Sequence, residues 1–157
     1  MPYVHRTNGL EILLVDFDGV LADYREGFKG EGVLGAPIPG ALEWLKLLCS
    51  AYEVHIWSCR DHQKITEWLY QHRAFLHFDL ASINFTEPGL NNEPKPYADF
   101  YLGDDDIFFQ ARAFTFHGEV REHTKWQWTR DTWMVVGTYL CTRANVAYQL
   151  KEGGIPA

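Results

Sequence analysis

Two carboxylates, two positions apart, follow an unbroken apolar run near the start of the chain. The segment Ile12–Val15 is apolar throughout, and Asp16, Asp18 and Gly19 come soon after it. Such a run predicts a strand buried on both faces, as in the middle of a parallel α/β sheet. Because ligands of open α/β sheets bind at the carboxyl ends of the strands, the two acids are predicted to lie where chemistry takes place. A hard cation such as Mg²⁺ would relieve their mutual repulsion, while two solvated acids at a strand end are the plainer alternative.

Three further polar groups follow later predicted strands in the same way. Ser58 ends one apolar segment, Lys95 stands between two prolines, and the acids Asp104–Asp106 follow the last of these strands. Taken singly, they have ordinary explanations, namely a strand-end cap, a solvated lysine and an acidic turn. The carboxyl ends of parallel strands meet at one edge of a sheet, so we expect the groups to converge there.

The order of these groups resembles the four signatures of the haloacid-dehalogenase-like hydrolases. The pattern Asp-x-Asp, Ser, Lys and Asp-Asp covers about residues 11–110. The resemblance implies a phosphohydrolase in which Asp16 is the nucleophile and Asp18 is the general acid and base. A carboxylate can attack phosphorus to form an aspartyl-phosphate, and a second acid can protonate the leaving oxygen and then activate water.

The resemblance also implies which groups hold the phosphate. The hydroxyl of Ser58 and the backbone N–H of Cys59 would bind phosphoryl oxygens. The ammonium of Lys95, held in an extended loop by its flanking prolines, would balance the charge of the nucleophile and the phosphate.

The metal ligands implied by the resemblance are Asp16, Asp18, Asp104 and Asp105, which would bind Mg²⁺ with Asp18 contributing its backbone carbonyl. A subgroup of small bacterial and phage proteins has an acid where this chain has Gly103. Either the acids are shifted by one position here or the site uses a Gly-Asp form, and both versions keep Asp104.

The elements that must position these residues alternate between strand and helix. Hydrophobic periodicity predicts strands at about 11–16, 53–58, 79–85 and 99–103, and helices at about 40–50 and 61–73. This order indicates an α/β fold, a Rossmann-like three-layer sandwich with a mainly parallel central sheet. Further on, the pattern predicts strands at 112–116 and 133–140 and a helical turn or two at 145–151.

The segment 20–40 is rich in glycine and proline, which predicts a flap or loop beside the acids. It is too short to be a folded cap domain, so the resemblance implies a capless enzyme with an open site. An open site suits a large phosphorylated substrate, which could be a macromolecule, or it needs a partner chain to close it.

Length and composition predict one domain over residues 1–157, in which 119–157 is a candidate C-terminal appendage. The net charge of −7 disfavours broad binding to nucleic acid or to anionic membranes. Three cysteines without close pairing, and the absence of a signal peptide or a long apolar run, lead us to expect a cytoplasmic protein.

A basic and aromatic segment, Lys125–Arg130 followed by Trp133, suggests a second function. Basic and aromatic side chains together can touch phosphates and stack on bases, as in a nucleotide or polynucleotide-end phosphatase. The alternative is that these tryptophans pack in the core. A third hypothesis is a non-catalytic phosphate-binding module on the same fold.

Overall fold

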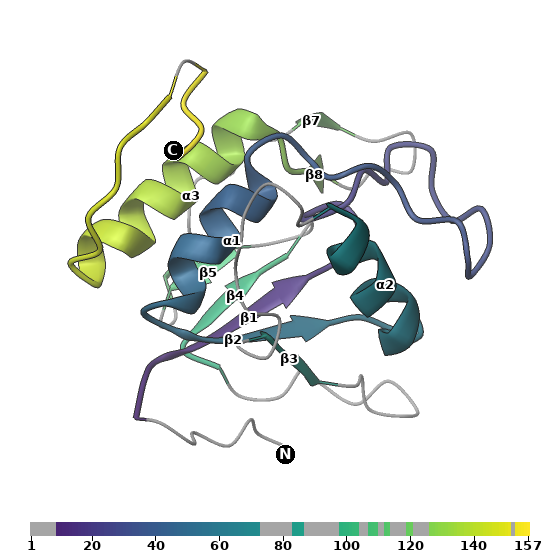
Figure 1. Ribbon diagram of the computed structural model, residues 1–157, viewed down its shortest axis with the longest axis horizontal. Coiled ribbons are helices and arrows are strands. Elements are labelled where there is room, and N and C mark those ends of the chain that lie inside the picture. The colour runs from purple at the N-terminus through teal and green to yellow at the C-terminus, as the bar shows by residue number, and fades with distance from the viewer. Residues whose placement is uncertain are drawn as a thin grey trace.

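The computed structural model describes residues 9–72, 83–86, 98–103, 107–109, 112–113, 119–120, 126–151 and 153–157 (Figure 1). Three helices and eight strands are described in this part of the chain. In chain order they are β1 Ile12–Asp16, α1 Ala41–Cys49, β2 Glu53–Trp57, α2 His62–His72, β3 Ile83–Thr86, β4 Phe100–Leu102, β5 Ile107–Phe109, β6 Arg112–Ala113, β7 Glu119–Val120, β8 Trp126–Gln127 and α3 Arg130–Arg143. No helix in these ranges is long and apolar enough to cross a membrane.

The main sheet has six strands in the order β3-β2-β1-β4-β5-β6. The first four are parallel, whereas β5 and β6 continue the sheet antiparallel. The central position of β1 follows from its sequence, because Ile12–Val15 is almost fully buried. The predicted α/β fold with a mainly parallel sheet, compatible with a Rossmann-like arrangement, is confirmed.

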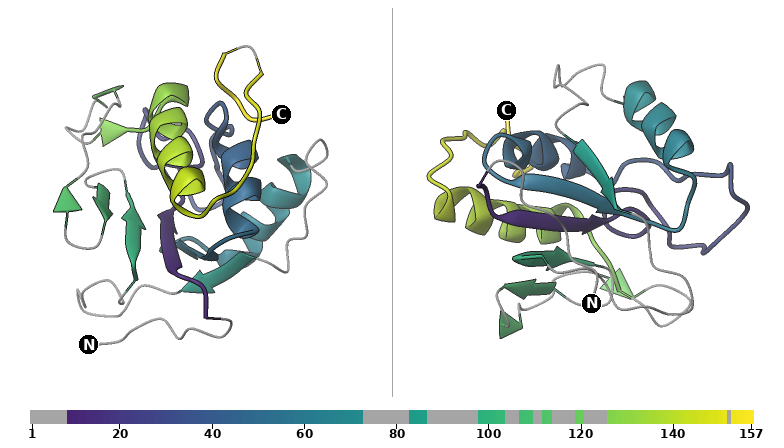
Figure 2. Two further views of the ribbon diagram at one scale, coloured as in Figure 1. Left: turned by 90° about the vertical axis from the view of Figure 1, so that its left-hand side faces the viewer. Right: turned by 90° about the horizontal axis from the view of Figure 1, so that it is seen from below.

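Both faces of β1 are covered, as the apolar run predicts. Leu13 and Val15 point into the main core, while Ile12 and Leu14 belong to a smaller apolar cluster with Ala98. All three described helices contribute to the main core, and Figure 2 shows them on one side of the sheet. The second helical layer of the predicted three-layer sandwich does not lie among the described residues.

Helix α3 corrects the prediction of a strand at 133–140. The segment is rich in aromatic and β-branched residues, which favour strands locally. The helix begins at a capping box, in which Thr129 and Thr132 each bond the other's backbone N–H. It then packs against α1, where Gly137 lies under the buried ring of Trp44. Tertiary packing therefore outweighs local propensity here.

The C-terminal part of the chain shares the main core with the sheet. Trp128, Trp133, Val136 and Leu140 are buried in that core together with β1. Residues 126–143, part of the candidate appendage, thus pack with the rest of the domain. The helical turns predicted at 145–151 are wrong, since this segment holds a turn and an isolated bridge between Leu150 and Pro156.

Candidate functional site

The two first acids lie at the carboxyl end of the central strand. Asp16 is the last residue of β1 and pairs in register with Trp57, the last residue of β2. On the other side, Val15 pairs with Leu102 at the end of β4. The chain therefore leaves β1, β2 and β4 at one edge of the sheet, where the predicted site residues were expected to converge.

A tight turn carries Asp18. The carbonyl of Phe17 accepts hydrogen bonds from the N–H groups of Leu21 and Ala22, at 2.9 and 3.0 Å. Gly19 adopts a φ of 81°, a conformation that favours glycine, and its N–H bonds back to the carbonyl of Ala22 at 2.8 Å. The sequence prediction that Gly19 allows a sharp turn after the acids is confirmed.

Asp18 makes an ion pair with Arg60, which follows β2. The Nε of Arg60 donates to Oδ2 of Asp18 at 2.7 Å, and the side chains are 4% and 22% exposed, respectively. Oδ1 of Asp18 is also buried. A lone arginine in a sequence is most often a surface charge, and the one sequence signal that Arg60 belongs to the site is its position two residues after Ser58.

Ser58 and Cys59 lie in the loop between β2 and α2. The Oγ of Ser58 accepts a hydrogen bond from the backbone N–H of Arg60 at 3.1 Å, so this hydroxyl shapes the turn that carries Arg60. Cys59 is exposed. Both residues follow β2 directly, on the same sheet edge as Asp16.

The segment of residues 23–36, called the flap below, leaves the acids and returns to them. At its base the N–H of Asp23 donates to the carbonyl of Ala36 at 2.8 Å. A Cβ on Gly35 would lie 2.0 Å from the carbonyl oxygen of Asp23, so this close approach requires glycine. Two other elements hold the flap, since Trp68 Nε1 donates to the carbonyl of Gly35 at 2.7 Å and Tyr24 N–H donates to Oε1 of Gln127 at 2.6 Å.

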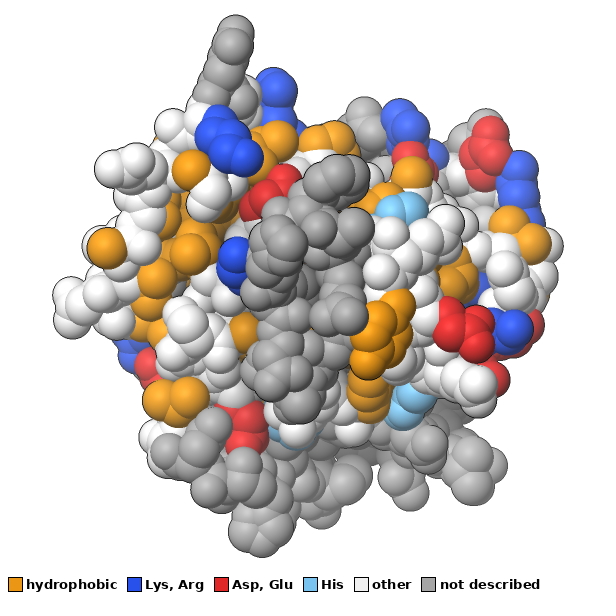
Figure 3. Space-filling view, viewed as in Figure 1, with side chains coloured by type: hydrophobic (Ala, Val, Ile, Leu, Met, Phe, Trp, Pro, Cys, Tyr) orange, Lys and Arg blue, Asp and Glu red, His pale blue; other side chains and the backbone are white. Residues whose placement is uncertain are grey.

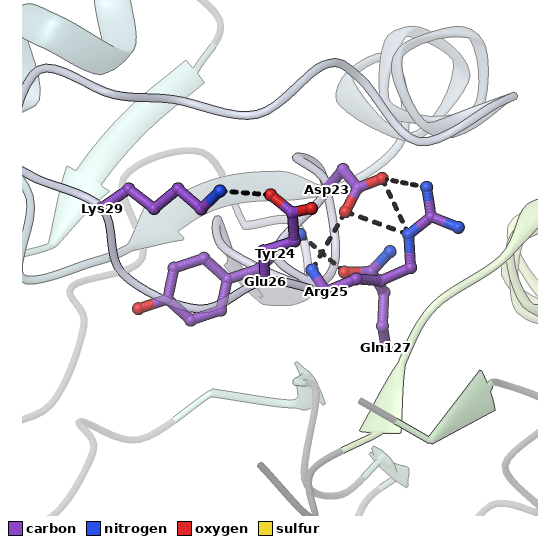
Figure 4. Close-up of polar contacts among 6 residues, drawn as sticks. All are labelled: Asp23, Tyr24, Arg25, Glu26, Lys29 and Gln127. Carbon is purple, nitrogen blue, oxygen red and sulfur yellow. Dashed lines mark hydrogen bonds and ion pairs between the residues drawn. The ribbon is translucent and has the colours of Figure 1, made fainter. Parts of the chain in front are cut away.

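Four charged side chains of the flap form two ion pairs (Figure 4). Nη2 of Arg25 lies 2.7 Å from Oδ2 of Asp23, and Lys29 pairs with Glu26. Partial burial alone would raise the pKa of Asp23, but its bonds to Arg25 and the charge of Arg25, with a further hydrogen bond from Gln127, hold that pKa below its usual value. Acidic and basic side chains consequently alternate on the surface at the right of Figure 3.

A cavity of about 540 Å³ lies within the flap. Its lining consists of flap residues alone, and the charged ones among them belong to the pairs just described. Neither Asp16 nor Asp18 lines it. We therefore place the candidate site at the strand ends and not in this cavity.

Two buried tryptophans hold the loops that flank the acids. The N–H of Trp128 donates to the carbonyl of Gly19 at 2.9 Å, and its Nε1 donates to the carbonyl of Gly103 at 2.8 Å. Trp133 Nε1 donates to the carbonyl of Val20 at 2.7 Å. Both indoles are fully buried, with ring centroids 4.8 Å apart. Of the residues proposed to stack on bases, these two are thus unable to do so.

The donor set at the sheet edge suits a hard cation. Asp16 and Asp18 supply carboxylate and carbonyl oxygens, which Mg²⁺ prefers. Gly103, which directly precedes Asp104 in the sequence, is buried and is tied to the turn after β1 through Trp128. Within the described ranges no three acids, histidines or cysteines form a metal-binding group. Lys95, Asp104 and Asp105 lie outside the described residues, so their predicted roles remain predictions.

Comparison with known proteins finds no matching family model, no matching curated protein and no matching solved structure.

Proposed function

We propose that this protein is a Mg²⁺-dependent phosphohydrolase, a phosphomonoester phosphatase that works through an aspartyl-phosphate intermediate. The observation that carries the proposal is the placement of Asp16 and Asp18 at the end of the central parallel strand, beside the end of β2. An ion-paired, largely buried Asp18 is hard to explain as a solvated acid at a strand end.

In the first step a carboxylate oxygen of Asp16 attacks phosphorus, and the bond from phosphorus to the leaving oxygen breaks. Asp18 must carry a proton at this stage; it gives that proton to the leaving oxygen, so an alcohol leaves and the phosphoryl group stays on Asp16. In the second step Asp18 takes a proton from water, whose oxygen attacks phosphorus. Inorganic phosphate leaves and the carboxylate of Asp16 is restored.

The phosphate and the metal would be held by residues at the same sheet edge. The loop of Ser58 and Cys59 offers a hydroxyl and backbone N–H groups, and Lys95 offers a positive charge. Asp16, Asp104 and Asp105, with the backbone carbonyl of Asp18, would hold Mg²⁺. When bound, Mg²⁺ supplies charge that shields the phosphate from the nucleophile.

The substrate class is a phosphorylated molecule, and the shortness of the flap favours a large one. The flap, which follows the first acids, holds too few residues to enclose a substrate. If the substrate is the end of a polynucleotide, Trp128 and Trp133 cannot stack on its bases, because both side chains are buried.

The test is phosphate release from a panel of phosphomonoesters, with Mg²⁺ and with a chelator. We expect Mg²⁺-dependent release, and Asp16→Asn should lower kcat/KM by about three orders of magnitude or more, since it removes the nucleophile. Asp131→Asn, the same change at an exposed acid in α3, serves as the matched control and should keep full activity.

Two results would count against the proposal. Undiminished hydrolysis by Asp16→Asn would refute Asp16 as nucleophile. If the wild-type protein releases no phosphate across the panel and forms no beryllofluoride adduct at Asp16, the non-catalytic phosphate-binding module becomes the better description.

A further inference from the structure

Arg60 joins three separate segments of the chain. Its Nε donates to Asp18 in the turn after β1, at 2.7 Å. Its Nη1 donates to two backbone carbonyls of the flap, those of Gly30 at 3.1 Å and Glu31 at 3.2 Å. Since Arg60 itself follows β2, one guanidinium ties together the first acids, the flap and the second strand end.

Aromatic rings of the flap complete the surroundings of this guanidinium. Its central carbon lies 5.2 Å from the ring centroid of Phe28 and 5.9 Å from that of Tyr24, within range of cation–π attraction. Phe28 is 61% exposed, so it covers Arg60 from the solvent side and is not itself part of the core. The guanidinium therefore contacts two carbonyls and two aromatic rings of the flap.

A second contact fixes the same end of the flap. The N–H of Asp61, next to Arg60, donates to Oε1 of Glu31 at 2.6 Å. The start of α2 is thus hydrogen-bonded to the flap beside the arginine. A displacement of the flap would break or shift the bonds of the guanidinium to Gly30 and Glu31, and the guanidinium would then shift relative to the carboxylate of Asp18.

The strength of this link follows from burial. The side chain of Arg60 is only 4% exposed, so its charge is largely removed from water and depends on its partners. A planar guanidinium offers donors in fixed directions, which lets one group bond a carboxylate and two carbonyls at once. Lysine, with a single nitrogen, cannot reproduce this arrangement.

We infer that Arg60 is a positioning residue that couples the conformation of the flap to the carboxylate of Asp18. With the flap docked, Arg60 holds that carboxylate in one orientation; with the flap displaced, the orientation is lost. The inference rests on the proposed function for its catalytic consequence, because Asp18 is the proposed acid and base. The coupling itself is a mechanical property that can be measured without any activity.

The first experiment is limited trypsin digestion of the full-length protein, with cleavage after Arg25 and Lys29 followed by mass spectrometry. Both side chains are more than half exposed, so cleavage there reports on opening of the flap. Removing one partner of a buried charge pair is costly, so Arg60→Gln and Asp18→Ala should each speed cleavage by about tenfold or more. The double variant should be cleaved no faster than Arg60→Gln alone.

The control is Arg143→Gln, which removes a more exposed arginine–carboxylate pair outside the flap. Arg143 pairs with Glu11 at 3.2 Å, and both side chains are about one-third exposed. It should leave cleavage in the flap at the wild-type rate. Wild-type cleavage rates in Arg60→Gln, or in Asp18→Ala, would overturn the coupling.

The second experiment reads the catalytic consequence from the leaving group. A positioned acid matters most when the leaving oxygen is a poor leaving group, so Arg60→Gln should lose more kcat/KM on an alkyl phosphate than on p-nitrophenyl phosphate. In the Asp18→Ala background, Arg60→Gln should cause no further loss. Equal losses on both substrates, or losses that multiply in the double variant, would overturn the positioning role.

Arg60→Lys keeps the charge and guards against misfolding of the glutamine variant. It should fold and restore part of the activity on the alkyl phosphate, while the flap stays more open than in the wild type. Full recovery of both would overturn the need for a guanidinium. If the wild-type protein hydrolyses nothing, the proposed function fails, whereas the digestion experiment still decides the coupling.

Discussion

Replacing Trp128 with phenylalanine tests how the turn after β1 and the end of β4 are held together. The substitution keeps an aromatic ring but removes the indole N–H that donates to the buried carbonyl of Gly103 at 2.8 Å. The backbone bond from residue 128 to the carbonyl of Gly19 stays. A phenylalanine here therefore removes one buried hydrogen bond and part of a ring.

The magnitude has two parts. Leaving the buried carbonyl of Gly103 without its donor costs about 1–3 kcal/mol. Phenylalanine is smaller than tryptophan, and the space that it leaves in the core costs about 1 kcal/mol more. For a chain of this length, each kcal/mol lowers the midpoint of thermal unfolding by about 2–4 °C. We expect Trp128→Phe to unfold roughly 4–16 °C below the wild type.

Trp44 provides a matched control for this measurement. Its ring is also fully buried in the main core, yet no residue in the described part of the chain accepts a hydrogen bond from its Nε1. Trp44→Phe removes the same atoms without leaving a carbonyl unpaired, and it deletes a buried donor that already costs stability. We therefore expect Trp128→Phe to be less stable than Trp44→Phe by about 2 kcal/mol or more.

The assay is equilibrium unfolding in urea at 25 °C, followed by far-ultraviolet circular dichroism because both substitutions alter tryptophan fluorescence. Equal losses of stability in the two variants would refute the role given to the bond with Gly103. An unchanged stability of Trp128→Phe would go further, since it would fit an exposed side chain that is available to stack on bases.

Two more predictions concern packing and thiol chemistry. Gly137→Ala should gain about 1 kcal/mol in helix propensity and lose about 1–3 kcal/mol to overpacking, because the new Cβ would lie 2.4 Å from ring atoms of the buried Trp44. The net effect is a lower unfolding midpoint in urea, and a variant as stable as the wild type would show that the two helices can move apart. A thiol reagent at pH 8 should modify Cys59 rapidly in the native protein, and all three cysteines only after denaturation, because burial raises the pKa of Cys49 to about 12 and that of Cys141 to about 11. Rapid modification of more than one thiol in the native state would contradict this.

The first half of the fold was predictable because local pattern and tertiary environment agree there. Strands expected at 11–16 and 53–58 lie at Ile12–Asp16 and Glu53–Trp57, and the helix expected at 61–73 lies at His62–His72. A strand that is buried on both faces can be recognised from its local sequence, because an unbroken apolar run is visible without knowledge of its tertiary contacts.

Helix α3 was not predictable in the same way. Its residues favour a strand locally, and the glycine in its middle weakens a helix by about 1 kcal/mol. What decides the conformation is the contact with α1, where any side chain at position 137 would collide with Trp44. That contact joins residues far apart in sequence, so the local pattern contained no trace of it.

The candidate site divides along the same line. The acids Asp16 and Asp18 and the loop of Ser58 could be placed from strand patterns and from their order. The ion pair of Asp18 with Arg60 spans 42 positions, and the bond from Trp133 to Val20 spans 113. The residue type alone does not reveal the role of Arg60 or of Trp133, because each role depends on the distant carboxylate or carbonyl that the side chain contacts.

These long-range bonds hold the backbone near Asp18 and the side chain of Asp18 in different ways. The carbonyls of Gly19 and Val20, which follow it directly, accept bonds from Trp128 and Trp133 inside the core. Swinging this turn would break buried hydrogen bonds, so the backbone at the acids is fixed. The side chain of Asp18 is held instead by Arg60, whose other contacts are on the flap at the surface. Under the proposed function, we expect adjustment to different substrates to occur in the flap and Arg60, while the backbone at the acids keeps its place.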